Sequence, residues 1–215
     1  MLKKYLYYFS QSIRNRGWMF TFKLLWHEWL DERYYGISTL QIDIQDLHLD
    51  DNHHYQGASY FVLNQTLSQL PIEAQKTVFI DFGAGKGRAL VVGASKHFAQ
   101  VIGVELSKDL CQVAHQNIAK VQHRYPHTHF EIVNTDARTY ALPSNANVLF
   151  FFNPFGASVM QQVINNIQQS VQKHPRPLYI VYVNPVFSDL FLSNNFSIFY
   201  ELRSKNYPEA IIFFT

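Results

Sequence analysis

Short apolar runs alternate with segments of helical periodicity along most of this chain. The apolar runs are the five segments 78–80, 101–104, 130–133, 148–152 and 178–183. Helical segments follow the first, second and fourth of these runs. Near-continuous apolar runs separated by helices are typical of a parallel sheet that is covered on both faces. The alternation therefore predicts an α/β fold built on a doubly wound, mostly parallel sheet.

The end of the chain follows a different pattern. Two apolar segments, 196–202 and 210–214, are separated only by a few residues around Asn206-Tyr207-Pro208. Parallel pairing of such neighbours would need a crossover connection, for which there is no room, so they should pair antiparallel. The sequence thus predicts a seven-strand sheet that ends in a C-terminal antiparallel hairpin.

The first 50 residues are predicted to form an N-terminal helical extension and a linker, and residues 51–215 the α/β domain. Aromatic and apolar residues recur at helical spacing in the extension: Trp18, Phe22, Leu25, Trp26 and Trp29. The segment is also basic, because no acidic residue precedes Glu28. Three roles are open for it: a lid packed across the core, a peripheral contact with a membrane interface, or a clamp for a large substrate.

Composition and residue spacing limit the partners, the compartment and the metal sites that can be expected. A net charge of +2 is too small to favour nucleic acid. The single cysteine, Cys111, cannot form an internal disulfide, which fits a reducing compartment. No segment has the pattern of a secretory signal or a membrane span, so a cytoplasmic protein is expected. His123, His127 and His129 lack cysteine or acidic partners at ligand spacing, and no metal site is predicted.

The most specific local feature is the segment 81–88, Asp-Phe-Gly-Ala-Gly-Lys-Gly-Arg, directly after the first apolar run. Glycines there permit a tight turn and a close approach of a ligand to the backbone. A helix that begins at the turn offers free N–H groups to an electron-rich ligand group. A dinucleotide fingerprint would need glycine at the sixth position from Gly83, where this chain has Arg88. A nicotinamide-dependent oxidoreductase is therefore the weaker alternative, and Arg88 is interpreted as a structural residue paired with a surface acid.

An acid two residues before the first glycine, followed by glycines at alternate positions, resembles the first motif of class I S-adenosylmethionine-dependent methyltransferases. Further positions match in order at the ends of successive predicted strands: Glu105, then Asp136-Ala137, then Asn153-Pro154-Phe155. Open α/β sheets bind their ligands at these carboxyl ends. The resemblance covers about residues 55–215 and implies a Rossmann-like methyltransferase whose cofactor is S-adenosylmethionine.

The resemblance also implies a role for the first matched positions. The backbone of Gly83, Gly85 and Gly87 would pass close to the methionine part of the cofactor. Asp81 would help to hold the ammonium group of that part as a charge-assisted contact. Glu105 would accept hydrogen bonds from both ribose hydroxyls, as acids at this position do in nucleotide-binding folds.

The remaining cofactor positions concern the adenine ring and the sulfonium. Leu106 would cover the adenine, and Asp136, next to Ala137, would accept from its amino group. Tyr55 and Tyr60 precede the first strand, where the family often adds a cofactor-covering element. Their aromatic faces could lie near the positive sulfonium; packing in the core is the alternative.

The segment Asn153-Pro154-Phe155 corresponds to the substrate-facing loop of the family. Methyl transfer from a sulfonium needs alignment and exclusion of water, and Asn153 and the Pro154 carbonyl could accept from an N–H and direct its lone pair. Phe152 and Phe155 could sandwich a flat or alkyl substrate. Members that methylate adenine or glutamine usually have a second proline or a later aromatic in this turn, and this chain does not. The preferred acceptor is an amine nitrogen of a protein lysine or a small molecule.

A non-catalytic binding or scaffold protein of the same fold is a further alternative. The presence of Asp81, Glu105, Asp136 and Asn153 argues against it, because a decayed site has no reason to keep all four groups. A second Asn-Pro dipeptide, Asn184-Pro185, follows the fifth predicted strand and is interpreted mainly as a strand terminator.

Overall fold

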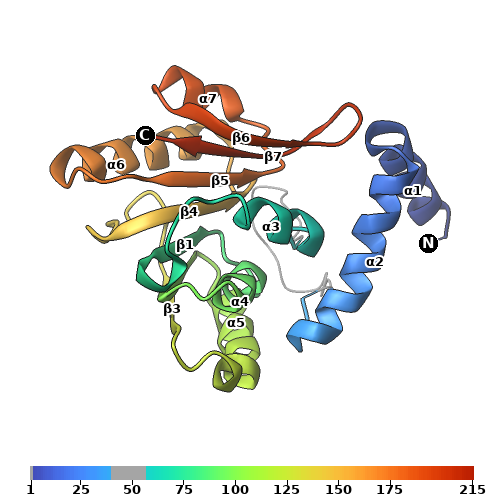
Figure 1. The fold of residues 1–215 in the computed structure, drawn as a ribbon, viewed down its shortest axis with the longest axis horizontal. Coiled ribbons are helices and arrows are strands. Elements are labelled where there is room, and N and C mark those ends of the chain that lie inside the picture. The colour runs from blue at the N-terminus through green and yellow to red at the C-terminus, as the bar shows by residue number, and fades with distance from the viewer. Residues whose placement is uncertain (1, 40–56) are drawn as a thin grey trace.

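A central seven-stranded sheet organises the chain in a computed structural model that describes residues 2–39 and 57–215 (Figure 1). The strands are β1 (Val78–Phe82), β2 (Gln100–Glu105), β3 (His129–Asn134), β4 (Ala146–Phe152), β5 (Tyr179–Val183), β6 (Ser197–Arg203) and β7 (Pro208–Phe214). Their order in the sheet is β3-β2-β1-β4-β5-β7-β6. The first five pair in parallel, and β7 runs antiparallel to both β5 and β6. The predicted sheet and its terminal hairpin are confirmed.

The strand order reverses between β1 and β4, which are neighbours in the sheet although two strands separate them in sequence. The connections on either side of such a switch point leave the sheet in opposite directions, so a crevice opens at the carboxyl ends of the two strands. The glycine loop follows β1 and the Asn153 turn follows β4, so the topology brings both to this crevice.

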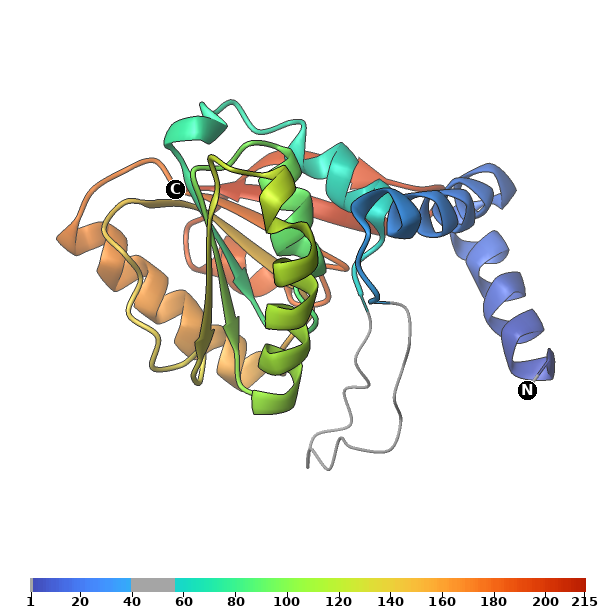
Figure 2. The same cartoon turned by 90° about the horizontal axis from the view of Figure 1, so that it is seen from below.

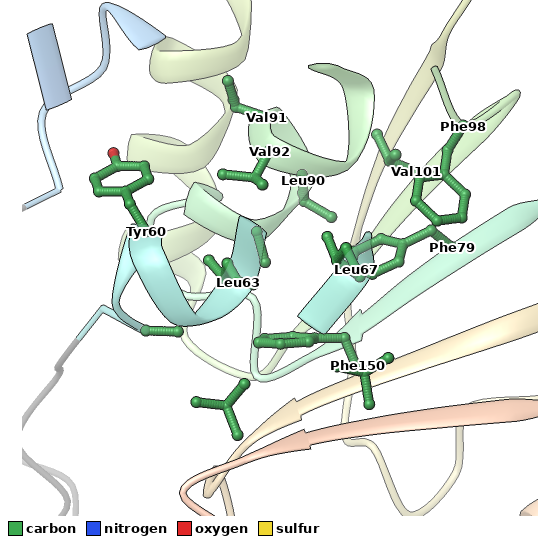
Figure 3. Close-up of a cluster of buried hydrophobic side chains, with 14 of the residues drawn as sticks. Tyr60, Leu63, Leu67, Phe79, Leu90, Val91, Val92, Phe98, Val101 and Phe150 are labelled. Atoms are coloured by element: carbon green, nitrogen blue, oxygen red, sulfur yellow. The ribbon is translucent and has the colours of Figure 1, made fainter. Parts of the chain in front are cut away.

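Helices cover both faces of the sheet (Figures 1 and 2). One face carries α3 (Tyr60–Leu67), α4 (Arg88–Ser95) and α5 (Lys108–Val121), and the other carries α6 (Ala157–Lys173) and α7 (Ser188–Ser193). Short 3₁₀ segments lie at Ala74–Lys76 and Gln122–Arg124. Figure 3 shows part of the first core cluster, in which Leu63 of α3 and Leu90 of α4 lie near Phe79 of β1 and Phe150 of β4. Burial on both faces explains why these strands are apolar throughout.

Two helices precede the domain: α1 (Leu2–Arg16) and α2 (Trp18–Tyr35). Gly17 joins them with a φ of +83°, and Gly36 ends α2 with its N–H bonded to the carbonyl of Glu32. Figures 1 and 2 show α2 beside α3 and the tip of the β6–β7 hairpin. The expected linker, with its possible strand at Ile42 and Ile44 and the boundary at residue 50, lies outside the described residues. None of the helices in the described parts of the chain has the length and hydropathy that a membrane crossing needs.

Candidate active site

The glycine loop after β1 turns back on the neighbouring strand. The N–H groups of Gly83 and Ala84 both donate to the carbonyl of Val104 on β2, at 2.8 and 3.2 Å. Three glycines of the loop have positive φ: Gly83 at +78°, Gly85 at +54° and Gly87 at +82°. A Cβ on Gly83 would lie 2.6 Å from the Cβ of Pro154. Both the backbone conformation and the close approach of the turn after β4 therefore require glycine at this position.

Glu105 ends β2 with its side chain directed at the glycine loop. Its Oε2 accepts a hydrogen bond from the N–H of Gly85 at 2.9 Å, and its Oε1 accepts from the N–H of Ser107 at 2.9 Å. Each carboxylate oxygen can accept more than one hydrogen bond, so both keep capacity for hydroxyl donors. Two backbone donors thus hold a pair of acceptors in place at the crevice.

Asp81 lies on β1, two residues before the first glycine, and its side chain is buried. None of the hydrogen bonds or ion pairs found between described residues involves its carboxylate. Burial, and then the charge of Glu105, raise the pKa of Asp81 well above its usual range. A buried carboxylate beside a second carboxylate is stabilised in its charged form by a cation. The site therefore suits a positively charged ligand group at Asp81.

Asp136 follows β3 and is held by Arg138, a residue that sequence reasoning missed. The Nε of Arg138 lies 3.0 and 2.9 Å from the two carboxylate oxygens of Asp136, and the backbone N–H of Arg138 donates to Oδ1 at 2.8 Å. Hydrogen bonds from Arg138 lower the pKa of Asp136. Ala137 is buried beside this pair, while Leu106 is 63% exposed at the end of β2.

The turn after β4 presents Asn153 in a left-handed conformation, with a φ of +41°. Its Oδ1 lies 3.4 Å from the hydroxyl of Tyr182 on β5, which in turn accepts from the N–H of Phe187 at 3.3 Å. Because the phenolic oxygen accepts from Phe187, its single proton is directed at Asn153. These two long hydrogen bonds connect the Asn153 amide to β5 and direct its oxygen toward Tyr182. Sequence reasoning did not identify Tyr182.

The same arrangement recurs on the next strand. Asn184 follows β5 with a φ of +51°, and its Oδ1 accepts from the hydroxyl of Tyr207. The repeated Asn-Pro dipeptide was the only signal in the sequence that two equivalent turns would end adjacent strands. Its tyrosine partners come from other positions along the chain, which a local pattern does not reveal.

The two phenylalanines of the predicted substrate sandwich do not face a common space. Phe152 packs against the core cluster under α3 and α4, whereas Phe155 packs against the cluster under α6. The Phe155 ring contacts Phe151 edge-on, with centroids 6.4 Å apart. Alternate residues of β4 point to opposite faces of the sheet, which separates Phe152 from the side on which Phe155 packs. The predicted sandwich is therefore wrong, and Phe155 alone borders the turn.

The solved structures with a similar fold include several methyltransferases. An S-adenosylmethionine-dependent methyltransferase from Aquifex aeolicus has a TM-score of 0.57 at 9% identity, covering 71% of this chain and 88% of that one. A putative methyltransferase from Escherichia coli has a TM-score of 0.55 at 15% identity, with 73% and 86% covered. A methyltransferase from Leishmania major has 0.54 at 14% identity, with 72% and 71% covered. At these identities the likeness establishes the fold. No curated protein sequence matches this chain.

A sequence family described as a methyltransferase domain matches residues 80–174. That span contains the glycine loop, Glu105, Asp136 and the Asn153 turn, in the strand order described above. Residues 80–174 of this chain are therefore a methyltransferase domain, and the sheet has the class I methyltransferase fold. S-adenosylmethionine, the methyl donor of that family, is its cofactor.

The residues of the crevice fit this cofactor. Asp81 offers a buried carboxylate for an ammonium group, Glu105 offers paired acceptors for a ribose diol, and the glycine backbone leaves space beside them. A dinucleotide would place a pyrophosphate at the glycine loop. Arg88 occupies the position at which a dinucleotide motif needs glycine for close packing of helix on strand, so the crevice fits the cofactor of this family better than a dinucleotide.

In this methyltransferase Tyr60 packs in the core, which was the alternative to a place beside the sulfonium. Its side chain has no exposed surface, and its ring stacks on that of Tyr35 with centroids 5.1 Å apart. The guanidinium of Arg88 lies 4.2 Å from the Tyr60 ring centroid. Figure 3 shows Tyr60 on α3 at the border of the apolar cluster. Tyr55, the other predicted covering residue, lies outside the described residues.

Arg88 has a structural role as predicted, but its expected partner on the surface is wrong. The side chain is 4% exposed, and its Nη1 lies 2.8 Å from Oε2 of Glu28 on α2. Arg88 also donates to the hydroxyl of Thr39 and to the carbonyl of Ala58, each at 2.8 Å. Glu32 lies 3.6 Å away on the same side of α2. The first residue after the glycine loop thus anchors the N-terminal extension.

Proposed function

We propose that this methyltransferase transfers the methyl group to an amine nitrogen of a protein lysine or a small molecule, with nucleic acid disfavoured as the acceptor. The observation that carries the proposal is the Asn153 turn, which packs on Gly83 and holds its amide oriented through Tyr182. The cytoplasmic location expected from the sequence stays a prediction.

Different residues bind the methyl donor and the methyl acceptor. When bound, S-adenosylmethionine supplies a methyl group on a positively charged sulfur, which is also the leaving group. Asp81, Glu105 and the glycine backbone hold the donor at the ends of β1 and β2. The Asn153 turn, at the end of β4, faces the same crevice. The protein therefore needs to orient the acceptor rather than to activate the donor.

Asn153 can orient an amine through its carbonyl oxygen. One lone pair of Oδ1 faces the Tyr182 hydroxyl, and the second stays available for an acceptor N–H. The carbonyl of Pro154 offers another acceptor beside it. Two accepting oxygens fix the N–H directions of an amine, and therefore the direction of its lone pair. The half-buried Phe155 borders this place with apolar surface, which favours the neutral amine over the ammonium form.

S-adenosylhomocysteine is expected to raise the melting temperature of the protein, and NAD(H) and NADP(H) are not. A ligand at a hundred times its dissociation constant stabilises the fold by about 2.7 kcal/mol. For a chain of this size that corresponds to a shift of about 5–10 °C. Differential scanning fluorimetry with the three ligands is the measurement. Stabilisation by a nicotinamide cofactor alone would contradict the cofactor assignment.

Asn153→Gly is expected to lower methyl transfer by about 10²-fold, because misplacement of the acceptor by about 1 Å has an effect of that size. Glycine tolerates the positive φ at this position, so the substitution removes the amide without straining the turn. Transfer is measured with radiolabelled cofactor and a cell extract resolved into protein, nucleic-acid and small-molecule fractions. Base-stable label in the protein or small-molecule fraction is the result expected for an N-methyl product.

The matched control is Asn184→Gly, which removes the equivalent amide from the equivalent turn one strand away. This variant should retain methyl transfer, and both variants should keep the affinity of the parent for S-adenosylhomocysteine. Equal loss in the two variants would mean that the turns act on the fold. Label confined to nucleic acid, or released by base as an ester, would contradict the amine proposal.

A further inference from the structure

Helix α2 packs Phe20, Leu24 and Tyr35 against the domain together with its acidic side chains, and it leaves a second apolar side exposed. Glu28 and Glu32 approach Arg88, and Asp31 lies 3.0 Å from the ring nitrogen of His27. The opposite side of the helix consists of large exposed side chains, which we call the aromatic face: Trp18, Met19, Phe22, Leu25, Trp26 and Trp29. Figures 1 and 2 show that this helix lies at the edge of the molecule. An ordinary surface helix exposes polar residues on its outer side, so the apolar outer side of α2 is unusual.

The aromatic face is a continuous surface rather than a scatter of single residues. Trp18, Phe22, Leu25 and Trp29 follow one another at a spacing of three or four residues, so they align along one side of the helix. Met19 and Trp26 have the same spacing from Phe22 and lie beside this row. The Phe22 and Trp26 rings stack with centroids 6.0 Å apart, and Trp26 and Trp29 lie 6.4 Å apart. Trp18 is 70% exposed and Trp29 58%. Contiguous exposed apolar surface of this kind marks an interaction site.

The exposed charges of helices α1 and α2, where their side chains are described, have one sign. Among residues 7 and 9–39, whose side chains are described, the exposed charged residues are Arg14 on α1 and Lys23 and Arg33 on α2. The Arg33 guanidinium lies 5.2 Å from the Trp29 ring centroid. The acidic residues of the same stretch are only partly exposed and contact partners within the protein. A partner that covers this face therefore contacts apolar rings and cations. The acidic residues of the same stretch point toward the protein.

We propose that the aromatic face of α2 binds the interface of a membrane that contains anionic lipids. Tryptophan is enriched at the level of lipid headgroups, where an amphipathic ring contacts both the acyl boundary and water. A helix with Trp and Phe on one side and exposed cations beside them lies in the plane of that interface. The proposal does not depend on the identity of the methyl acceptor, because none of these residues belongs to the crevice.

The three tryptophans of the chain, Trp18, Trp26 and Trp29, all lie on the aromatic face, so selectively excited tryptophan fluorescence reports on this surface alone. Vesicles of phosphatidylcholine mixed with phosphatidylglycerol should shift the emission to the blue and protect it from acrylamide. Three cations near a charged surface predict binding about 10²-fold weaker to vesicles of pure phosphatidylcholine. Raising the salt concentration should weaken binding to the anionic vesicles.

A charge-reversal pair tests the lipid preference. Lys23→Glu with Arg33→Glu should reduce affinity for anionic vesicles to the level of the neutral ones or below. The matched control is Lys120→Glu with Lys173→Glu, which changes the net charge equally at exposed positions on α5 and α6. That control should bind anionic vesicles nearly as well as the parent, and both variants should melt like it.

Two outcomes would overturn the proposal. Emission unchanged by anionic vesicles would show that lipid does not cover the face. A blue shift that grows with protein concentration in the absence of lipid, together with a larger species in gel filtration, would identify a second copy of the chain as the partner.

Discussion

Glu105→Ala is expected to weaken the binding of S-adenosylhomocysteine by about 10²–10⁴-fold, the largest effect on cofactor affinity of any single substitution in the crevice. Hydrogen bonds to a charged group contribute about 1.5–3 kcal/mol each, and the carboxylate is assigned two ribose hydroxyls. The substitution also leaves the N–H groups of Gly85 and Ser107 without their acceptor, which loosens the glycine loop. Isothermal titration calorimetry measures the loss directly.

One further variant tests the contribution of the Glu105 charge, and a second serves as a control. Glu105→Gln keeps one carbonyl oxygen but not the charge, so its loss should be smaller than that of the alanine variant. Glu131→Ala removes an exposed acid from the neighbouring strand β3 and should leave the affinity unchanged. An affinity for S-adenosylhomocysteine that survives Glu105→Ala would remove Glu105 from the cofactor site, whatever the activity of the variant.

The placement of Glu105 beside the glycine loop could be predicted because its signals are local in sequence. A loop that must turn sharply beside a ligand needs its glycines, and an acid at the end of the next strand lies beside that loop in every sheet of this order. The strands themselves were recognisable because burial on both faces makes them apolar throughout. Gly85 and Glu105 are twenty positions apart, yet the strand order alone makes them neighbours.

The partners of the site residues could not be predicted, because they depend on tertiary contacts. Tyr182 reaches Asn153 from the adjacent strand, and no spacing rule connects the two residues. Arg138 binds Asp136 two residues away, but an aspartate and an arginine so placed can equally well face apart. Such contacts become visible only once the strands and loops have been placed.

Helix α2 shows a different limit of sequence reasoning. Periodicity identifies a helix and the residues that share a side, but it does not say which side faces the protein. An aromatic side usually packs inward because burial of apolar surface stabilises the fold. Here Arg88, buried at the start of α4, requires acidic partners, and Glu28 and Glu32 supply them from the other side of the helix. Phe20 and Tyr35 also pack on the domain from the side that carries these acids, so apolar contacts and the ion pairs with Arg88 together select the orientation of α2.

Arg88→Met is expected to destabilise the fold by about 3–5 kcal/mol, the loss typical of removing one partner of a buried ion pair. At the size of this chain the melting temperature should fall by about 6–20 °C. Methionine keeps much of the apolar stem but leaves Glu28, Thr39 and the Ala58 carbonyl without their donor. The matched control is Arg203→Met, which removes the exposed partner of Glu201 and should cost less than about 1 kcal/mol.

The pH dependence of the loss of stability in Arg88→Met identifies the cause of that loss. Burial raises the pKa of Glu28, while the Arg88 charge opposes the rise. An acid whose folded pKa exceeds its unfolded pKa binds its proton more tightly in the folded state, so its contribution to stability declines as the pH rises between the two values. Without Arg88 the folded pKa rises further, so the deficit of Arg88→Met in melting temperature should be larger near about pH 8 than near about pH 5. Adding Glu28→Gln should recover part of the loss at the higher pH. A deficit independent of pH, and unaffected by Glu28→Gln, would mean that lost packing rather than an uncompensated carboxylate destabilises the variant.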